Sequence, residues 1–250
     1  MKVIASYNIK GGVGKTTTAV NLAWLAASQG KRTLLWDLDP QGAAGYCLRV
    51  KGKGHGKRLL KGKSDAGDVI QNTNYVDLDL LPSDFSYRNA DVLLHEEKYP
   101  LKRLQKVIKP LKHDYDIIIL DCPPGLTLLS EAVFRASDAL LVPTLPSILS
   151  LRSLKMLLEF RKEKSLKDLQ LFAFLNMVDR RKKLHNDVLN SRLRMKSWML
   201  EGYIPYVSEL EQIAERREPV FVYAPGGRAA EGYRELWNEI NEWLGLTLGS

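Results

Sequence analysis

The sequence predicts a single-domain α/β protein over residues 1–248, with a doubly wound, mostly parallel sheet that carries helices on both faces. Three observations support this fold class. An apolar run at 3–5 is followed by a glycine-rich loop and then by a helical pattern over 17–28. Two further apolar runs, 33–36 and 117–120, each end in an aspartate. Continuous apolar strands are typical of a parallel sheet that is buried on both faces, and 250 residues suffice to bury a sizeable core.

The rest of the chain continues this alternation of strand and helix. The first helix is predicted to end at Gly30, because glycine commonly follows a helix C-terminus. Segment 49–63 holds seven Lys or Arg residues, four glycines and no acid, which predicts a flexible, solvated loop, with contact to DNA or an adaptor as the alternative. Gly249 and Ser250 are expected to be a remnant of cloning. The remaining patterns predict strands at 78–82, 139–143 and 171–175, and helices at 86–94, 101–111 and 149–160.

Composition narrows the class of protein further. The content of 45% hydrophobic and 26% charged residues is that of a soluble globular protein, and no apolar run or leader pattern indicates a membrane span or secretion, so we expect a cytoplasmic protein. Cys47 and Cys122 are too few for a disulfide framework and lack metal-ligand spacing. The formal charge of +8 favours an acidic partner such as nucleic acid or an anionic membrane, although solubility would also explain it.

The glycine-rich loop has the chemistry of a phosphate site. Gly11, Gly12 and Gly14 allow backbone N–H groups to approach a triphosphate without interference from Cβ atoms. The helix that follows adds the positive end of its dipole. Lys15 is placed to reach the β and γ phosphates, and the Thr16 hydroxyl is placed to bind Mg²⁺.

The loop departs from the general G-x-x-x-x-G-K-[ST] pattern, because Ile9 occupies the first glycine position and is followed by a second lysine, Lys10. The variant K-G-G-x-G-K-T-T resembles the deviant Walker A loop of the ParA/MinD family of dimerising ATPases. The resemblance implies that Lys10 contacts the nucleotide of a partner subunit, so that the ATP-bound form is a face-to-face homodimer. The alternative is a glycine-rich turn that binds nothing. The ATP-binding residues implied here are Gly11, Gly12, Val13, Gly14, Lys15, Thr16 and Thr17.

Aspartates follow two of the predicted strands. Asp37-Leu38-Asp39-Pro40-Gln41-Gly42 resembles the second motif of the family, in which Asp39 would orient the attacking water and contribute to the metal site. Asp37 would then lie nearer the metal or be structural, and a simple turn is the alternative. Asp121 ends the strand at 117–120 and matches a Walker B aspartate, which binds Mg²⁺. The family more often has serine where Gly125 stands. The resemblance thus names Lys10, Lys15 and Asp39 as catalytic, and Thr16, Asp39 and Asp121 as metal-binding.

The adenine base is expected between two later segments. Asn176 and Asp179 follow the strand at 171–175 and could bond the base edge, and Arg180 could stack on it. A cap of the strand exit is the alternative for Asn176. The turn at Pro205 resembles the second adenine-contacting turn of the family, where backbone groups make the contact.

Basic residues in the C-terminal half are expected to bind DNA. In ParA-like proteins this half binds DNA without sequence preference, and phosphate contacts of this kind carry affinity but no sequence information. Any single arginine could simply be solvated. The candidates are Lys182, Lys183, Arg192, Arg194, Lys196, Arg216 and Arg217.

The resemblance implies a function as well as a site. It implies an ATPase that is slow alone and stimulated by DNA and a ParB-like adaptor, that is associated with the nucleoid when ATP is bound, and that positions a chromosome, plasmid or protein organelle. A nucleotide-switched scaffold with negligible turnover, a small-molecule ligase and a MinD-like membrane-cycling ATPase are alternatives. Four glutamates in the last helical pattern argue against a membrane anchor, and the two cysteines do not match an iron–sulfur protein. The glutamates are Glu231, Glu235, Glu239 and Glu242.

Overall fold

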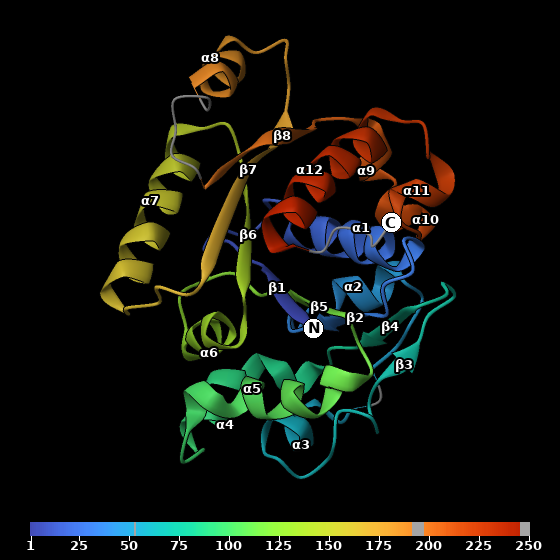
Figure 1. The fold of residues 1–250 in the computed structure, drawn as a ribbon, viewed down its shortest axis with the longest axis vertical. Helices are drawn as coiled ribbons and strands as arrows, with labels where there is room; N and C mark the ends of the chain where they lie inside the picture. Colours follow the sequence, from blue (N-terminus) through green and yellow to red (C-terminus); the bar gives the residue numbers. More distant parts are fainter. Residues whose placement is uncertain (53, 192–197, 246–250) are drawn as a thin grey trace.

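The computed structural model describes residues 1–52, 54–191 and 198–245 (Figure 1). The predictions for Arg192, Arg194, Lys196, Gly249 and Ser250 lie outside the described residues. Within the described part, eight strands form one sheet in the order β3-β4-β2-β5-β1-β6-β7-β8, and every neighbouring pair is parallel except β3 with β4. The predicted fold class is confirmed. The strands are β1 (Lys2–Ser6), β2 (Thr33–Asp37), β3 (Gln71–Asn72), β4 (Leu78–Leu81), β5 (Ile117–Asp121), β6 (Ala139–Thr144), β7 (Gln170–Val178) and β8 (Met199–Pro205).

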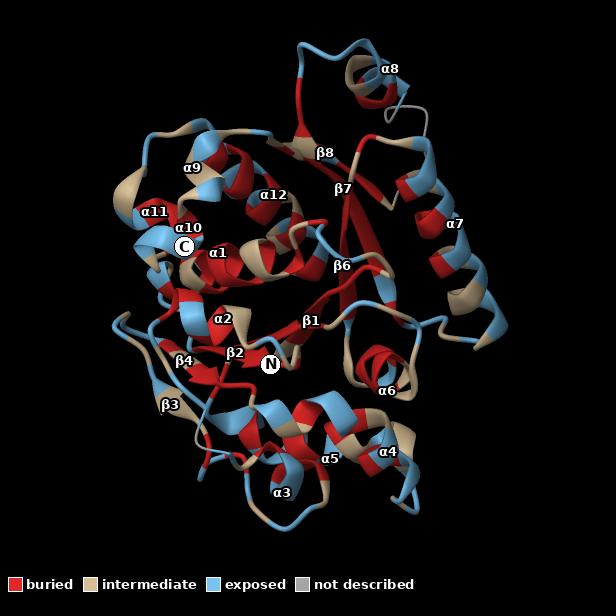
Figure 2. Ribbon diagram, turned by 180° about the vertical axis from the view of Figure 1, so that it is seen from behind, coloured by how far each residue is buried: buried red, intermediate tan, exposed pale blue. Residues whose placement is uncertain are grey.

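Helices cover both faces of the sheet, as buried apolar positions on the two sides of each strand require (Figures 1 and 2). One layer contains α1 (Lys15–Ser28), α2 (Ala43–Cys47), α9 (Ser208–Glu211), α10 (Ile213–Arg216), α11 (Val220–Tyr223) and α12 (Arg228–Leu244). The other layer contains α3 (Gly56–Leu60), α4 (Ala90–His95), α5 (Arg103–Ile108), α6 (Leu128–Ala136) and α7 (Ile148–Glu163), while α8 (Lys183–Ser191) lies beside β7 and β8. Three 3-10 turns lie at Phe85–Asn89, Pro100–Lys102 and Lys109–His113.

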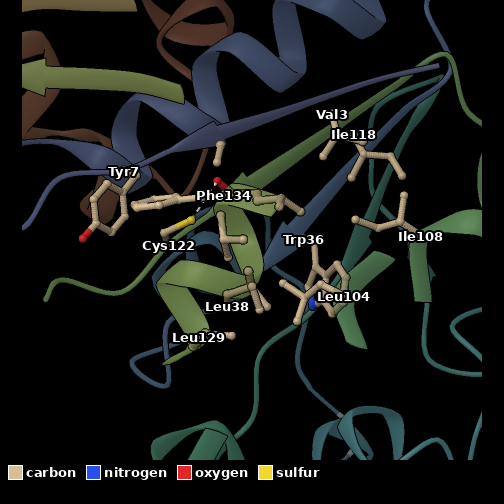
Figure 3. Packing of buried hydrophobic residues seen from close by; sticks show 14 of the residues in the cluster. Val3, Tyr7, Trp36, Leu38, Leu104, Ile108, Ile118, Cys122, Leu129 and Phe134 are labelled. Atoms are coloured by element: carbon tan, nitrogen blue, oxygen red, sulfur yellow. Dashed lines mark hydrogen bonds between the residues drawn. The ribbon is translucent and has the colours of Figure 1, made fainter. Parts of the chain in front are cut away.

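The packing beneath β2 and β5 shows how the second layer is held (Figure 3). Trp36 of β2 is fully buried against Leu104 and Ile108 of α5. Its indole Nε1 donates to the Tyr87 hydroxyl over 3.1 Å, so the polar atom of this large side chain is satisfied inside the core. A buried aromatic residue therefore anchors the helices that follow the basic segment.

Helix α12 joins the first layer late in the chain, because its buried face packs on α1 and β8. Tyr233 and Trp237 are fully buried there. The indole Nε1 of Trp237 donates to Gln29 over 2.8 Å. The backbone N–H of Val220, shortly before α12, donates to Asn21 of α1 over 2.8 Å. The C-terminal part of the described chain thus completes the support of the first helix.

Segment 49–63 is not the solvated loop that its composition predicts. Its described part contains α3, whose Leu59 and Leu60 are buried in the core, with exposed fractions of 1% and 0%. In the sequence the two leucines stand among seven basic residues, so the segment has the composition of a charged loop. Burial of the two leucines outweighs that composition and folds the segment onto the core. In the described part of the chain, no helix combines the length and the apolar content needed to cross a membrane.

Candidate functional site

The carboxyl ends of β1, β2 and β5 meet at one edge of the sheet. The register pairs Asp121 with Ser6 on one side and with Asp37 on the other. Ligand sites of doubly wound sheets form outside the carboxyl ends of the strands, at the point where the strand order reverses. The topology therefore brings the glycine-rich loop and both aspartate motifs together, as the sequence predicts.

The glycine-rich loop runs from β1 directly into α1. Gly12 and Gly14 have φ values of +70° and +89°, a backbone region in which side chains are strained. The Asn8 side chain accepts from the backbone N–H of Lys10 over 2.9 Å and donates to the Pro143 carbonyl over 2.8 Å. The loop is thereby fixed to β6 as well as to its own strand, with the first turn of α1 directed at the space above it.

Asn176, at the end of β7, supports the loop from the other side. Its Nδ2 donates to the Val13 carbonyl over 2.7 Å, its Oδ1 accepts from the backbone N–H of Met177, and its side chain is almost fully buried. A Cβ on Gly14 would lie only 2.3 Å from this Nδ2. Asn176 therefore positions the loop, and it also lines the smaller cavity described below, where its second N–H and second lone pair leave the predicted contact with the base edge untested.

Lys15 carries the cation of the site. Its side chain is largely buried, and its Nζ donates to the Lys10 carbonyl over 3.0 Å. Burial lowers the pKa of Lys15, and the nearby Asp121 carboxylate acts against that shift. The cation is therefore held at the loop by a single neutral acceptor among the described residues, which leaves its charge available to a phosphate.

Asp121 gives the clearest indication of a cation-binding position. Its side chain is fully buried, and neither carboxylate oxygen accepts a hydrogen bond of normal geometry from the described residues. Burial raises the pKa of Asp121 well above its usual value and the Asp37 carboxylate raises it further, while the Thr16 hydroxyl acts in the opposite direction. A buried carboxylate without partners is costly, and a bound cation would remove this cost. The oxygen donors of Asp121 and Thr16 suit Mg²⁺.

The two aspartates after β2 have different environments. Asp37 is fully buried, and its carboxylate accepts from the backbone N–H groups of Asp39, Ala44 and Gly45 over 3.1 to 3.2 Å. Burial raises its pKa to about 7. Asp39 is half-buried, accepts from the N–H of Gln41 and faces the loop. The Asp37 carboxylate is thus held by the backbone inside the fold, whereas Asp39 lines the hollow over the loop. Among the described residues, no three His, Cys, Asp or Glu side chains form a ready metal cage, so Mg²⁺ would depend on waters and phosphate oxygens for its other ligands.

A hollow of about 580 Å³ lies over the loop and is lined by Lys15, Thr16, Asp39 and Met177, among others. Met177 also lines a smaller cavity of about 80 Å³, together with Pro205 and with Thr17 of α1. No pattern in the sequence singles out Met177. Its positive φ of 56° marks a strained backbone, which only the structure reveals. The two cavities adjoin each other, because Gly14, Thr17 and Met177 line both.

Asp179 and Arg180 lie outside both of these cavities. They line a third hollow of about 690 Å³, which borders the smaller cavity because Pro205 lines both. Asp179 forms an ion pair with Arg181, with a shortest distance of 2.9 Å, which lowers the pKa of Asp179 to about 2. Of the residues predicted to hold adenine, the structure places Asn176 and Pro205 beside the loop but not Asp179 and Arg180.

The two described arginines among the residues predicted to bind DNA, Arg216 and Arg217, make contacts within the protein. Arg216 donates to the side chain of Gln212 and lies over the ring of Tyr223. Arg217 donates to the Tyr46 carbonyl over 2.9 Å, and its guanidinium lies 4.5 Å from the centroid of that ring. Lys182 and Lys183 are exposed at the start of α8, well separated from α10 (Figure 1). The described members of the predicted DNA surface do not form one patch.

A buried lysine in a glycine loop at a helix N-terminus, next to strand-end aspartates, defines a nucleotide-binding P-loop protein of the doubly wound class. A family model described as an AAA domain matches residues 1–171. The chain is 34% identical over 248 residues to the sporulation initiation inhibitor protein Soj of Bacillus subtilis, covering 96% of this chain and 98% of Soj. It is 32% identical over 247 residues to the chromosome partitioning protein ParA of Myxococcus xanthus, covering 96% of this chain and 87% of ParA. The chain belongs to the ParA/MinD family of ATPases.

Solved structures share the fold over almost the whole chain. An ATP complex of McdA from Cyanothece has a TM-score of 0.85 at 22% identity, covering 100% of this chain and 98% of McdA. Cobyrinic acid a,c-diamide synthase from Mycobacterium smegmatis, with bound ADP and magnesium, has a TM-score of 0.81 at 25% identity, covering 99% and 97% of the two chains. Proteins with such different names share this fold, so the fold alone does not identify the family. The similarity in sequence identifies it.

Proposed function

We propose that this protein is an ATP-hydrolysing dimerisation switch, which binds DNA without sequence preference in its ATP-bound state and positions or segregates a cargo through an adaptor protein. Membership of the ParA/MinD family supports the broader statement, that of a ParA-like ATPase acting in partition or positioning. The observation that carries the nucleotide-binding part of the proposal is the buried cation of Lys15 at the glycine loop, near the buried carboxylate of Asp121, which accepts no hydrogen bond of normal geometry from the described residues.

The residues of the site divide the work of phosphoryl transfer. The loop N–H groups and Lys15 would bind the β and γ phosphates, while Thr16 and Asp121 would hold Mg²⁺, which neutralises phosphate charge when bound. Asp39 would orient a water that attacks the γ phosphorus as the bond to the ADP oxygen breaks. The chemistry asks the protein mainly for position and charge, so a half-buried carboxylate at the rim of the hollow is suited to this role.

The dimer is proposed to close through Lys10, which would reach the nucleotide of the second subunit. Its side chain is half-buried at the start of the loop, where its carbonyl already accepts from Lys15. Closure would depend on the γ phosphate, so hydrolysis would open the dimer and release DNA. The ATP-bound protein would then reside on the nucleoid.

The test uses Asp39→Ala, which is expected to trap the ATP state. With ATP and Mg²⁺, light scattering should show a dimer of Asp39→Ala and a monomer of the double variant Asp39→Ala/Lys10→Ala. The matched control is Lys31→Ala in the same background, since Lys31 is a half-buried lysine near the opposite end of α1. A monomeric Asp39→Ala variant, or a dimer that persists without Lys10, would overturn the switch.

A scaffold with negligible turnover is the alternative that the same site allows. The two are separated by ATP hydrolysis in the presence of both DNA and a candidate adaptor. Turnover that rises with both additions and is lost in Asp39→Ala supports the ATPase. Stimulated turnover that is unchanged in Asp39→Ala would show that Asp39 does not have the catalytic role proposed for it.

A further inference from the structure

The positive charge of the chain is concentrated outside the predicted DNA-binding half. Residues 49–113 contain fourteen Lys or Arg and eight Asp or Glu, so they account for six of the eight surplus positive charges. Residues 176–250 contain eleven of each and are formally neutral. The basic clusters that stand out late in the sequence are thus balanced by acids, whereas the middle of the chain is truly basic.

Helix α5 and the 3-10 turns beside it place part of this charge on one exposed strip. Leu104, Val107 and Leu111 are buried against the core. Their spacing leaves the opposite face of the helix to solvent. The exposed lysines on that face recur at helical intervals of four and three residues, and they are Lys102, Lys106 and Lys109.

Helix α3 adds a second set of exposed basic residues, namely Lys57 and Arg58, with Lys63 shortly after it. Arg103 of α5 fixes the two helices to each other, because its Nη2 donates to the Leu59 carbonyl at the end of α3 over 2.6 Å. The two helices lie side by side at the same end of the molecule in both views (Figures 1 and 2). We call Lys57, Arg58, Lys63, Lys102, Lys106 and Lys109 the α3–α5 face.

The lysines of the α5 strip are not neutralised within the protein. Of the ion pairs among the described residues, none involves Lys102, Lys106 or Lys109, and the local pair joins Lys61 to Glu96 over 2.6 Å. The nearby exposed acids are Asp65, Asp68 and Glu96, and Lys57 and Lys63 of the face lie close enough to Glu96 to help lower its pKa. The ring of Tyr99, which is 51% exposed, has the Nζ atoms of Lys98 and Lys106 at 5.5 and 5.4 Å from its centroid. The strip therefore offers cations that are available to an outside partner.

We propose that the α3–α5 face binds the phosphate backbone of double-stranded DNA. The proposal rests on the DNA binding proposed above and assigns it a surface that differs from Arg216 and Arg217, whose side chains are engaged within the protein. At about 1.5 Å rise per residue, the strip places a cation about every 4.5 to 6 Å along the helix axis. Duplex DNA carries one charge per about 1.7 Å of its axis, so every lysine can find a phosphate in any register.

An acidic protein partner fits the same face less well. Specific recognition of a peptide needs pockets for its side chains. The hollow between α3 and α5 has a volume of only about 210 Å³, and it is lined by Asp65 as well as by Lys106. A basic surface whose hollow is this small matches backbone-directed binding, which carries affinity without sequence information.

The test compares two triple variants that remove the same charge. Lys102→Gln/Lys106→Gln/Lys109→Gln alters the α5 strip. Its matched control alters three exposed lysines of α7 and the turn after it, and is Lys155→Gln/Lys162→Gln/Lys167→Gln. Binding of a fluorescein-labelled random-sequence duplex is followed by anisotropy, with ATP and Mg²⁺ present, between about 50 and 200 mM salt. The α5 triple variant should bind at least about tenfold more weakly at the lower salt, and the slope of log affinity against log salt should flatten by about 3. The control should stay within about twofold of wild type.

The outcomes separate the surface from the function. If the wild type itself fails to bind DNA with ATP, the proposed function fails. If the wild type binds and the α5 triple variant binds equally well, or if both triple variants weaken equally, the assignment to this face is overturned. The substituted side chains are exposed, so the thermal midpoint and ATP binding should be unchanged. If they are not, Lys102→Gln and Lys109→Gln singly replace the triple variant, each with an expected change in slope of about 1.

Discussion

Asn176→Ala tests whether the amide at the end of β7 holds the phosphate loop or reads the nucleotide base. The structure commits its Nδ2 to the Val13 carbonyl over 2.7 Å in a buried setting. Removing the amide leaves that carbonyl without its partner, which costs about 1 to 3 kcal/mol of unfolding free energy. If the same cost falls on the ordered loop, it lowers nucleotide affinity about 5- to 150-fold.

The assay pairs urea unfolding of the apo protein with calorimetric titration of ATP and of GTP. Because the contact is to the loop, both nucleotides should lose affinity by the same factor, and their ratio should stay constant. Asn190→Ala, at an exposed position of α8, is the matched control and should change neither quantity. Unchanged stability combined with an altered ATP to GTP ratio would refute the positioning role and restore contact with the base.

Three further perturbations test the same structure. Gly14→Ala should destabilise the protein by at least about 1 to 2 kcal/mol through its positive φ alone, and further through the clash with Asn176, whereas Gly11→Ala, which meets no atom within 4 Å, should leave urea unfolding almost unchanged. Asp121→Asn should raise the thermal midpoint of the apo protein but abolish magnesium-dependent ATP binding. The folded-state pKa of Asp121 is raised, so the apo wild type loses stability as pH rises above 3.8 and its buried carboxyl ionises, whereas the asparagine variant does not. The difference between the thermal midpoints of variant and wild type should therefore widen over this pH range. A difference that narrows would contradict this reasoning. Leu59→Ala should cost about 2 to 5 kcal/mol in urea unfolding, and a loss below about 0.5 kcal/mol would indicate that segment 49–63 is solvated after all.

The sequence was sufficient for the features that depend on local pattern. Apolar runs such as 117–120 are confirmed as strands, and the order of glycine loop and helix is confirmed around Lys15. Strand ends carry Asp37 and Asp121 to one edge because parallel pairing fixes their register. These elements depend on periodicity and on the topology of a doubly wound sheet, both of which a single sequence reveals.

The features that the sequence left open or misjudged depend on contacts between distant segments. The different environments of Asp37 and Asp39 follow from three backbone N–H groups that donate to the Asp37 carboxylate and that only the fold brings to it. The role of Asn176 depends on a residue 163 positions away in the sequence. Segment 49–63 was misjudged because the burial of Leu59 and Leu60 outweighs the solvation of its basic side chains. That burial depends on core residues from distant parts of the chain, such as Leu104, which the local sequence does not show.

The joining of α12 to α1 has a consequence for how the protein is made. The phosphate loop and α1 leave the ribosome early, but the side chains that cover α1 include Tyr233 and Trp237, which are synthesised much later. Until then, the apolar face of α1 lacks its native cover in the nascent chain. A stable phosphate loop should therefore be acquired only after α12 has left the ribosome.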